Sequence, residues 1–337
     1  MVEGTFKPLV SWDGKENLQG IARTSLLEQT LQDRAAVFDS IQASIMACLE
    51  SLGSRKQQTA VIMPVTAPLD ALMGVIRAGA MPVLLDVSAV DLQLDRALLR
   101  EALEALENAV VYLNIPGGLP VAPELVEALA AVPTCPTIVD TRLPPVYMHF
   151  HGSYTIYDLS TLVGAGAVML PRDPEQLDTL KILRNEAVAE LPEVCAALAY
   201  KRLDNIQDIQ DTSEYADLLE TSSKSGIIGF RSAYPTPVFL AMVEDGKAVL
   251  SHIQSKNYQG AWGAVPLYFY PHVRERWQEE PEYPVAEKLA KEVILLPNHC
   301  GIDRTELLEE IYGKCKENQD GRAEEGEAPD EGGDSSL

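Results

Sequence analysis

The sequence predicts an α/β protein with a mainly parallel sheet covered by helices, followed by a smaller α+β domain. Three observations predict it. Short apolar runs alternate with stretches of helical spacing from about residue 40 to residue 185. From Gly226 onward the pattern changes to short strands separated by turns. A chain of 337 residues that is 46% hydrophobic can also bury a core of the necessary size.

The first predicted helix follows the capping residues Asp39 and Ser40 and ends at Gly53. Strands and helices then alternate, and such alternation requires crossover connections between parallel strands. The predicted strands cover residues 60–65, 81–87, 109–115, 136–140 and 166–170. The predicted helices cover residues 68–78, 95–108, 122–131, 173–185 and 192–219, with a closing helix over 304–316.

The predicted organisation has four parts: an N-terminal segment (1–37), a large domain (38–225), a small C-terminal domain (226–317) and an acidic tail (318–337). The domain boundary is placed near Ser222 to Gly226. The tail has seven acidic residues, one arginine and no large apolar residue except Leu337, so we expect it to be disordered. It is interpreted as a solubilising tail, with a partner-binding arm as the alternative.

Composition excludes several classes of function. The formal charge of −23, with no local basic patch, disfavours nucleic acid and anionic membranes as partners. No apolar run is long enough to cross a bilayer and the first residues do not resemble a signal peptide, so a cytoplasmic location is expected. The five cysteines lack CxxC spacing and are expected to be reduced. His149 and His151 share one face of an extended segment, but no third ligand is evident and no metal site is predicted.

Several short segments occur in an order that is typical of one enzyme family. They are AVIMPVT (60–66), AGAMPVLLD (78–86), IVD (138–140), LKILRN (180–185), the stretch 191–203, AEKLA (286–290) and LLPNH (295–299). Together they resemble the DegT/DnrJ/StrS sugar aminotransferases over roughly residues 38–312. The resemblance implies the aspartate-aminotransferase fold, which is fold type I of the pyridoxal-phosphate-dependent transferases, with active sites at a dimer interface.

The resemblance also implies a lysine that holds pyridoxal phosphate as a Schiff base, five residues before a glycine-rich turn. That turn corresponds to residues 164–167, so the lysine position falls on Leu159, with Ser160 beside it. No lysine occurs between Gln57 and Leu180, and a small shift of the alignment therefore restores none. A known variation on the family has histidine in place of the lysine, and no histidine is present there either.

Other parts of the implied cofactor site are altered. Asp140 corresponds to the carboxylate that pairs with the pyridine nitrogen, although a strand-ending aspartate also caps turns. Ser40 is a weak counterpart of the phosphate-binding turn and has Asp39 beside it, with helix capping as the alternative. The stacking aromatic residue is missing from residues 66–68. Arg142 is interpreted either as the partner of an anionic ligand or as a surface or Asp140-paired arginine.

The sequence therefore predicts a sugar-aminotransferase-like protein without the Schiff-base lysine: a non-catalytic scaffold or partner subunit, or a protein that retains a nucleotide-sugar cleft. A homodimer, or a heterodimer with an active paralogue, is expected, and no cofactor is expected. The alternative is an active pyridoxal-phosphate-dependent nucleotide-sugar aminotransferase of polysaccharide or secondary-metabolite biosynthesis. Its lysine would then be displaced, with Lys181 and Lys201 the nearest candidates beyond the gap.

Overall fold

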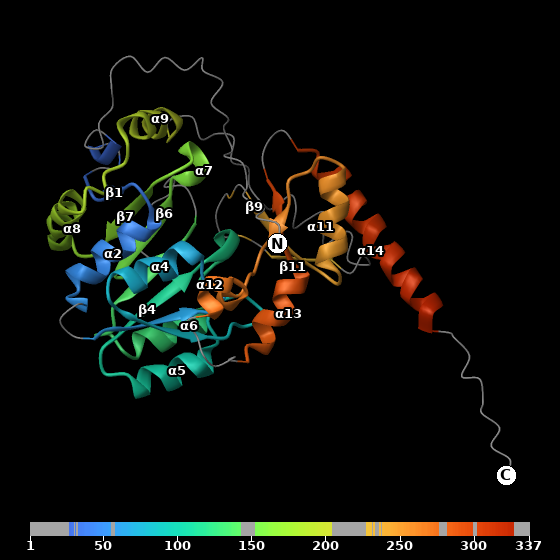
Figure 1. Ribbon diagram of the computed structural model, residues 1–337, viewed down its shortest axis with the longest axis horizontal. Helices are drawn as coiled ribbons and strands as arrows, with labels where there is room; N and C mark the ends of the chain where they lie inside the picture. The colour runs from blue at the N-terminus through green and yellow to red at the C-terminus, as the bar shows by residue number, and fades with distance from the viewer. Residues whose placement is uncertain are drawn as a thin grey trace, which may run out of the picture.

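The computed structural model describes residues 27–29, 31, 33–54, 58–142, 152–203, 227–230, 232, 236, 238–275, 282–298 and 302–326. These residues form two sheets, each with its own helices (Figure 1). The larger sheet has the strand order β1-β7-β6-β5-β4-β2-β3. Its strands are β1 (Ala36–Phe38), β2 (Ala60–Pro64), β3 (Met81–Leu85), β4 (Ala109–Asn114), β5 (Thr137–Asp140), β6 (Tyr154–Asp158) and β7 (Ala167–Pro171).

The larger sheet is mainly parallel, as the sequence predicts. Strands β3, β2, β4, β5 and β6 pair in parallel, whereas β7 is antiparallel to both of its neighbours, β6 and β1. The carboxyl ends of the parallel strands therefore meet at one edge of the sheet. This edge is where any ligand of an open α/β sheet is expected.

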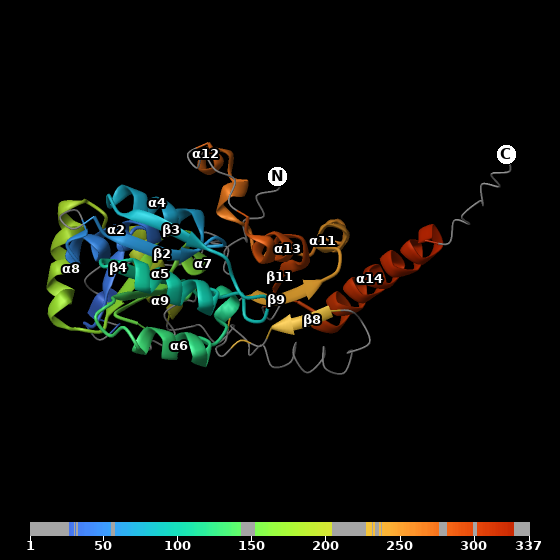
Figure 2. The same ribbon diagram turned by 90° about the horizontal axis from the view of Figure 1, so that it is seen from below.

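Helices cover both faces of this sheet, because the strand residues alternate between two cores (Figure 2). Val61, Met63 and Tyr112 pack into one core, whereas Ile62 and Val111 pack into the other. Helices α2 (Ile41–Ser51), α4 (Leu69–Arg77) and α8 (Glu175–Glu186) cover the first face. Helices α5 (Arg96–Ala105) and α6 (Pro123–Ala130) cover the second, and α7 (Ser160–Val163) and α9 (Glu193–Leu203) pack with β1 and β7 in a separate apolar cluster.

The smaller sheet is antiparallel and has the order β10-β11-β9-β8. Its strands are β8 (Ile227–Phe230), β9 (Val238–Val243), β10 (Ala261–Trp262) and β11 (Val293–Pro297). Helices α11 (Gly246–Ser255) and α14 (Arg304–Gly326) pack on it, and α13 (Pro284–Glu292) lies between it and the larger sheet (Figure 1). The short elements η3 (Leu267–Phe269) and α12 (Pro271–Arg274) precede α13.

The two sheets are joined through the second core of the larger one. Leu240 of β9 and Leu289 of α13 pack in the same apolar cluster as Ile62 of β2. Asp86, which follows β3, accepts hydrogen bonds from the backbone N–H groups of Val285 (3.1 Å) and Ala286 (3.0 Å) in the first turn of α13. The carboxyl ends of β2 and β3 are thereby tied to the smaller sheet.

Some elements differ from the sequence-based expectation. Strands β1 and β6 were not predicted: β1 has only three residues, and β6 carries Thr and two Tyr residues, so neither forms a clear apolar run. Helices α11 and α13 occur where only strands and turns were expected. The predicted boundary at Ser222 to Gly226, most of the helix predicted over 192–219, and the His149 and His151 pair lie outside the described residues.

The closing helix is longer than predicted. It was expected to end at Lys316, but α14 continues to Gly326, into the segment predicted to be disordered. Its first half is held by burial of Leu307, Ile311 and Cys315 against α11. The added residues are ENQDGRAEEG. Their Glu, Gln, Arg and Ala residues favour continuing a helix that is already nucleated, whereas their Asn, Asp and Gly residues do not.

Replacing Val188 with glycine is expected to stabilise the protein. Val188 follows α8 with φ 54° and is 85% exposed, so a β-branched side chain is in the left-handed region and buries almost nothing. The Ala189 N–H donates to the Arg184 carbonyl at 3.0 Å, which is the helix-ending pattern that favours glycine. Urea denaturation should show V188G to be more stable by about 1 kcal/mol.

Ile182→Gly is the matched control, since Ile182 is also exposed but lies inside α8. There glycine should cost about 0.5–1 kcal/mol. If V188G were no more stable than the wild type, valine would not be strained by the left-handed backbone at position 188.

Candidate functional site

The carboxyl edge of the larger sheet gathers polar side chains from three neighbouring strands. Asp140 is the last residue of β5, Asn114 is the last of β4 and is paired with Asp140, and Asp158 is the last of β6. The Ile115 N–H donates to the Asp140 carbonyl at 2.9 Å, which holds the two strand ends in register. The candidate site is therefore built on the carboxyl ends of the strands, where open α/β sheets bind ligands.

Asp140 is completely buried, and both of its carboxylate oxygens have partners from the protein. The Tyr112 hydroxyl donates to Oδ2 at 2.6 Å. Arg142 donates twice, from Nε to Oδ2 at 2.9 Å and from its backbone N–H to Oδ1 at 3.2 Å. Of the two interpretations of Arg142, pairing with Asp140 is the one that the structure shows.

Arg142 also binds Asp70, in the first turn of α4. Its Nη1 lies 3.0 Å from Asp70 Oδ2 and its Nη2 lies 2.6 Å from Asp70 Oδ1, which is a two-pronged arginine–carboxylate pair. Arg142 has φ 51°, and this left-handed backbone accompanies a side chain that bonds the residue two positions earlier. One guanidinium thus connects the end of β5 to the start of α4.

The charges of this cluster do not balance. Three carboxylates, from Asp70, Asp140 and Asp158, face the single guanidinium of Arg142. Burial raises the pKa of Asp140 and of Asp158, and in both cases the effect outweighs the opposing attraction of Arg142. Burial also acts to raise the pKa of Asp70, but the charge and hydrogen bonds of Arg142, together with backbone hydrogen bonds, outweigh it and the pKa of Asp70 is lowered. Among the described residues of this cluster, the excess of acidic groups disfavours an anionic ligand.

Leu159 and Ser160, the residues at the expected lysine position, follow β6 directly. Leu159 is fully buried and packs with Leu162, Val168 and Leu170 in the apolar cluster of α7 and β7. Ser160 donates to Asp158 from its backbone N–H, at 2.7 Å, and from its hydroxyl, at 2.8 Å. Position 159 is thus part of the core, and position 160 is engaged by the aspartate before it.

Ser40 caps α2, which is the structural alternative that the sequence left open. Its Oγ accepts from the Ala43 N–H at 3.2 Å and donates to Asp39 Oδ1 at 2.7 Å. The hydroxyl is therefore already used in both directions, and the adjacent carboxylate adds negative charge.

Lys181, one of the two candidates for a displaced lysine, lies on α8. Its Nζ is 3.2 Å from Glu28 Oε2, and the same buried glutamate is paired with Arg184 and accepts from the Val37 N–H at 3.0 Å. Its amine is thus held beside β1, and β7 and β6 separate β1 from β5 in the sheet. Lys201 lies in α9, and its side chain is outside the described part of the chain.

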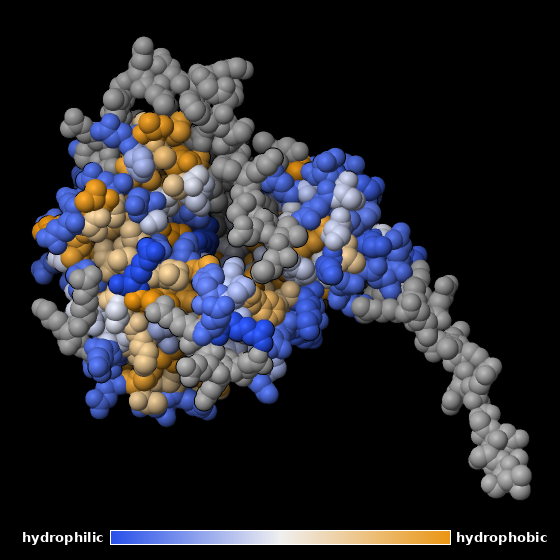
Figure 3. Space-filling model, in the orientation of Figure 1, coloured by the Kyte–Doolittle hydropathy of each residue, from blue (hydrophilic) through white to orange (hydrophobic). Residues whose placement is uncertain are grey.

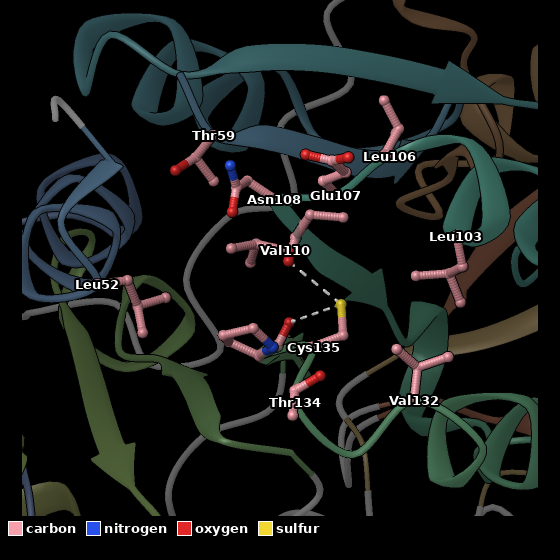
Figure 4. A pocket seen from close by; sticks show the side chains of 12 residues that line it. Leu52, Thr59, Leu103, Leu106, Glu107, Asn108, Val110, Val132, Thr134 and Cys135 are labelled. Carbon is pink, nitrogen blue, oxygen red and sulfur yellow. Dashed lines mark hydrogen bonds between the residues drawn. The ribbon is translucent and has the colours of Figure 1, made fainter. Parts of the chain in front are cut away.

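A separate hollow of about 200 Å³ lies at the opposite, amino end of the parallel strands (Figure 4). It is lined by residues around the starts of β2, β4 and β5, including Thr59, Asn108 and Cys135. The Cys135 thiol lies 3.2 Å from the Ala109 carbonyl oxygen, and burial raises its pKa, which keeps it protonated. This thiol is consequently a poor nucleophile.

Two negative findings concern the described residues only. Within those ranges, no three or more His, Cys, Asp or Glu side chains are grouped to hold a metal ion. Of the helices that the structure describes, none is both long and apolar enough to pass through a bilayer.

Three members of the cluster were not identified from sequence: Tyr112, Asp70 and Asp158. A sequence signal existed for each. Tyr112 interrupts the apolar run of β4 two residues before Asn114, Asp70 lies in the first turn of the helix after β2, and Asp158 is followed two residues later by a serine. Their convergence on Asp140 depends on strand order, which a single sequence does not specify.

Comparison with solved structures identifies the fold. A protein from Streptococcus pneumoniae assigned as a sugar aminotransferase superposes with a TM-score of 0.76 at 15% identity, covering 90% of this chain and 92% of that one. A DegT/DnrJ/EryC1/StrS aminotransferase from Brucella abortus gives 0.71 at 16% identity (87% and 89%). PseC of Helicobacter pylori, an aminotransferase of pseudoaminic acid biosynthesis, gives 0.72 at 16% identity (90% and 92%).

No protein-family model and no curated protein sequence matches the chain. The structural likeness nevertheless extends over most of each chain. It confirms the predicted fold class, that of the pyridoxal-phosphate-dependent aminotransferases. At such low identity the likeness establishes the fold alone.

Replacing Tyr112 with phenylalanine is expected to destabilise the protein by about 1.5–3 kcal/mol, because a buried carboxylate loses a hydrogen bond. Urea denaturation measures the difference. Tyr154→Phe is the matched control, since that hydroxyl is 3.1 Å from the neutral Ser51 hydroxyl and its loss should cost about 1 kcal/mol or less. If both variants lost the same free energy of unfolding, the Tyr112–Asp140 hydrogen bond would contribute no more to stability than the Tyr154–Ser51 hydrogen bond.

Replacing Asp158 with asparagine should make stability less dependent on pH. The folded-state pKa of Asp158 is raised, so the folded protein binds this proton more tightly than the unfolded chain does. In the wild type this group therefore lowers stability as pH rises from about 4 through the folded pKa. D158N should be more stable than wild type at pH 8, with the advantage shrinking toward pH 4.

Urea denaturation of both proteins between pH 4.5 and pH 8 tests this expectation. The asparagine Oδ1 can still accept from the Ser160 N–H, and its Nδ2 can donate to the Ser160 hydroxyl in place of the hydrogen bond that the carboxylate accepts. An advantage of D158N that did not grow with pH would contradict the assignment.

Proposed function

We propose that this chain is a sugar-aminotransferase-like protein that does not catalyse transamination and that acts as a scaffold or as a partner subunit. One observation carries the proposal: the position that corresponds to the Schiff-base lysine is Leu159, and its side chain is buried in an apolar cluster. The sequence has no lysine from residue 57 to residue 180, so none comes from the strands of the larger sheet that form this edge. Without such an amine the covalent step of the family's chemistry has no nucleophile.

The other residues at the site do not fit pyridoxal phosphate. The oxygens of Asp140 are bonded to Arg142 and Tyr112, whereas a pyridinium nitrogen would need one of them. Ser40 uses its hydroxyl within its own helix cap, beside Asp39. The net negative charge at the strand ends further disfavours a phosphate group.

The same charge argument favours a partner over a small ligand. A nucleotide sugar carries a diphosphate, which the excess carboxylates at the carboxyl edge would repel. The larger sheet ends on β3, whose five apolar residues are all at least partly exposed, with Met81 55% exposed. An apolar edge strand of this kind is suited to contact with a second subunit, either another copy of the chain or an active paralogue.

Adding pyridoxal phosphate to the purified protein, recording the absorbance spectrum and then reducing with borohydride tests the proposal. We expect no stoichiometric adduct, because no described lysine amine is bonded or paired within the Asp140 cluster. Lys181→Arg is the matched control, since it removes the candidate amine but keeps the charge paired with Glu28. A stoichiometric adduct at a single lysine, lost in K181R or mapped to Lys201 by mass spectrometry, would instead establish the active aminotransferase.

A further inference from the structure

The Asp140 carboxylate presents an energetic problem that the fold must solve. It has no exposure to solvent, and a buried carboxylate without a counter-ion is strongly unfavourable. The Tyr112 hydroxyl supplies a hydrogen bond but no charge. The position that corresponds to Asp140 in the family resemblance faces the cationic nitrogen of a cofactor ring, so in that arrangement a ligand supplies the charge.

In this chain the cation comes from Arg142. Its Nε and its backbone N–H bond the two oxygens of Asp140, and its two terminal nitrogens bond the two oxygens of Asp70. The pKa of Arg142 is raised well above its ordinary value by these carboxylates, although burial opposes the effect, so the guanidinium stays charged. The side chain is 23% exposed and Asp70 is 43% exposed, which places the pair at the mouth of the edge, over the buried Asp140.

We propose that Arg142 is a built-in counter-ion that takes the place of a bound pyridinium on Asp140 and closes the carboxyl edge of the sheet without any ligand. The inference deepens the proposed function and rests on it, because it assumes a protein that is complete without the cofactor. It adds that the missing lysine is not the only obstacle to binding. Even a ring that needs no covalent attachment finds Asp140 already paired.

The backbone at position 142 is part of this arrangement. Arg142 has a left-handed backbone, with φ 51°, and its side chain bonds both its own strand end and α4. Thr141, the intervening residue, is fixed to β6 by its N–H and its hydroxyl, at 3.0 and 2.9 Å from the Ile156 carbonyl oxygen. A lysine at position 142 would keep the charge but would lose the fork that holds Asp70 and Asp140 together.

A double-mutant cycle with chemical rescue tests the proposal by thermal denaturation. Arg142→Ala should lower Tm by roughly 5–10 °C, because it leaves a buried carboxylate unpaired. Combining it with Asp140→Asn should restore much of that loss, since the buried charge is then gone. Arg96→Ala is the matched control: Arg96 is similarly exposed and is paired with Asp91 on the other face of the sheet, and its loss should shift Tm far less.

Two small molecules then test whether the space left by the Arg142 side chain in R142A binds a cation. Millimolar ethylguanidinium should raise the Tm of R142A but not that of the wild type, R96A or the D140N/R142A double variant. Pyridoxine, which has the cofactor's ring without its phosphate or aldehyde, should show the same selectivity. If R142A does not fold alone, recovery of a cooperative transition in the double variant, together with a Tm of R142K below that of the wild type, carries the same meaning.

The proposal is overturned if R142A keeps the wild-type Tm, if the double variant loses as much as the two single changes summed, or if neither probe stabilises R142A. It is also overturned if wild-type protein binds pyridoxine and D140N does not, because Asp140 would then be free to pair with a ligand. None of these outcomes involves a lysine, whereas failure of the proposed function appears as a borohydride-trapped adduct. The two failures can therefore be told apart.

Discussion

A fully buried carboxylate at the end of β5, that of Asp140, determines how the residues around this strand end are arranged. Asp140 requires a positive partner, and Arg142, two residues later and with φ 51°, provides it. The same guanidinium bonds Asp70, so the first turn of α4 is tied to β5. The charge requirement of one buried residue thus links the end of a strand to the start of a helix.

The two halves of this edge are closed in different ways. At β2, β3 and β4 the smaller sheet covers it: Asp86 caps α13, and Gly117, with φ 57° and no room for a side chain against Leu240, lets the turn after β4 approach β9. At β5 and β6, the described side chains that bond across the strand ends are charged or polar, among them Asp70, Arg142 and Ser160. The first arrangement combines a helix cap with close apolar packing, and the second depends on charge.

The sequence predicted the fold better than the site. Periodicity located α2, α4 and β2 to within a few residues, because these elements bury one face or lie wholly inside. It missed β6, whose polar composition hides a strand that is buried throughout. At the site, Asp140 and Arg142 could be identified as a possible pair, since they are two residues apart. Asp70 could not, because it is 72 positions from Arg142 and only the parallel strand order brings them together.

The two departures from the family's site, at positions 159 and 142, are stabilised by separate parts of the structure. Leu159 belongs to the apolar cluster of α7 and β7, so a lysine there would bring a charge into an apolar core. Arg142 belongs to the charged cluster, so its removal would leave Asp140 without a cation. Leu159 and Arg142 are each stabilised by their own cluster, so replacing one of them does not make replacement of the other more favourable. A single substitution is therefore a poor route back to a cofactor site, whereas the present arrangement satisfies both clusters without any ligand.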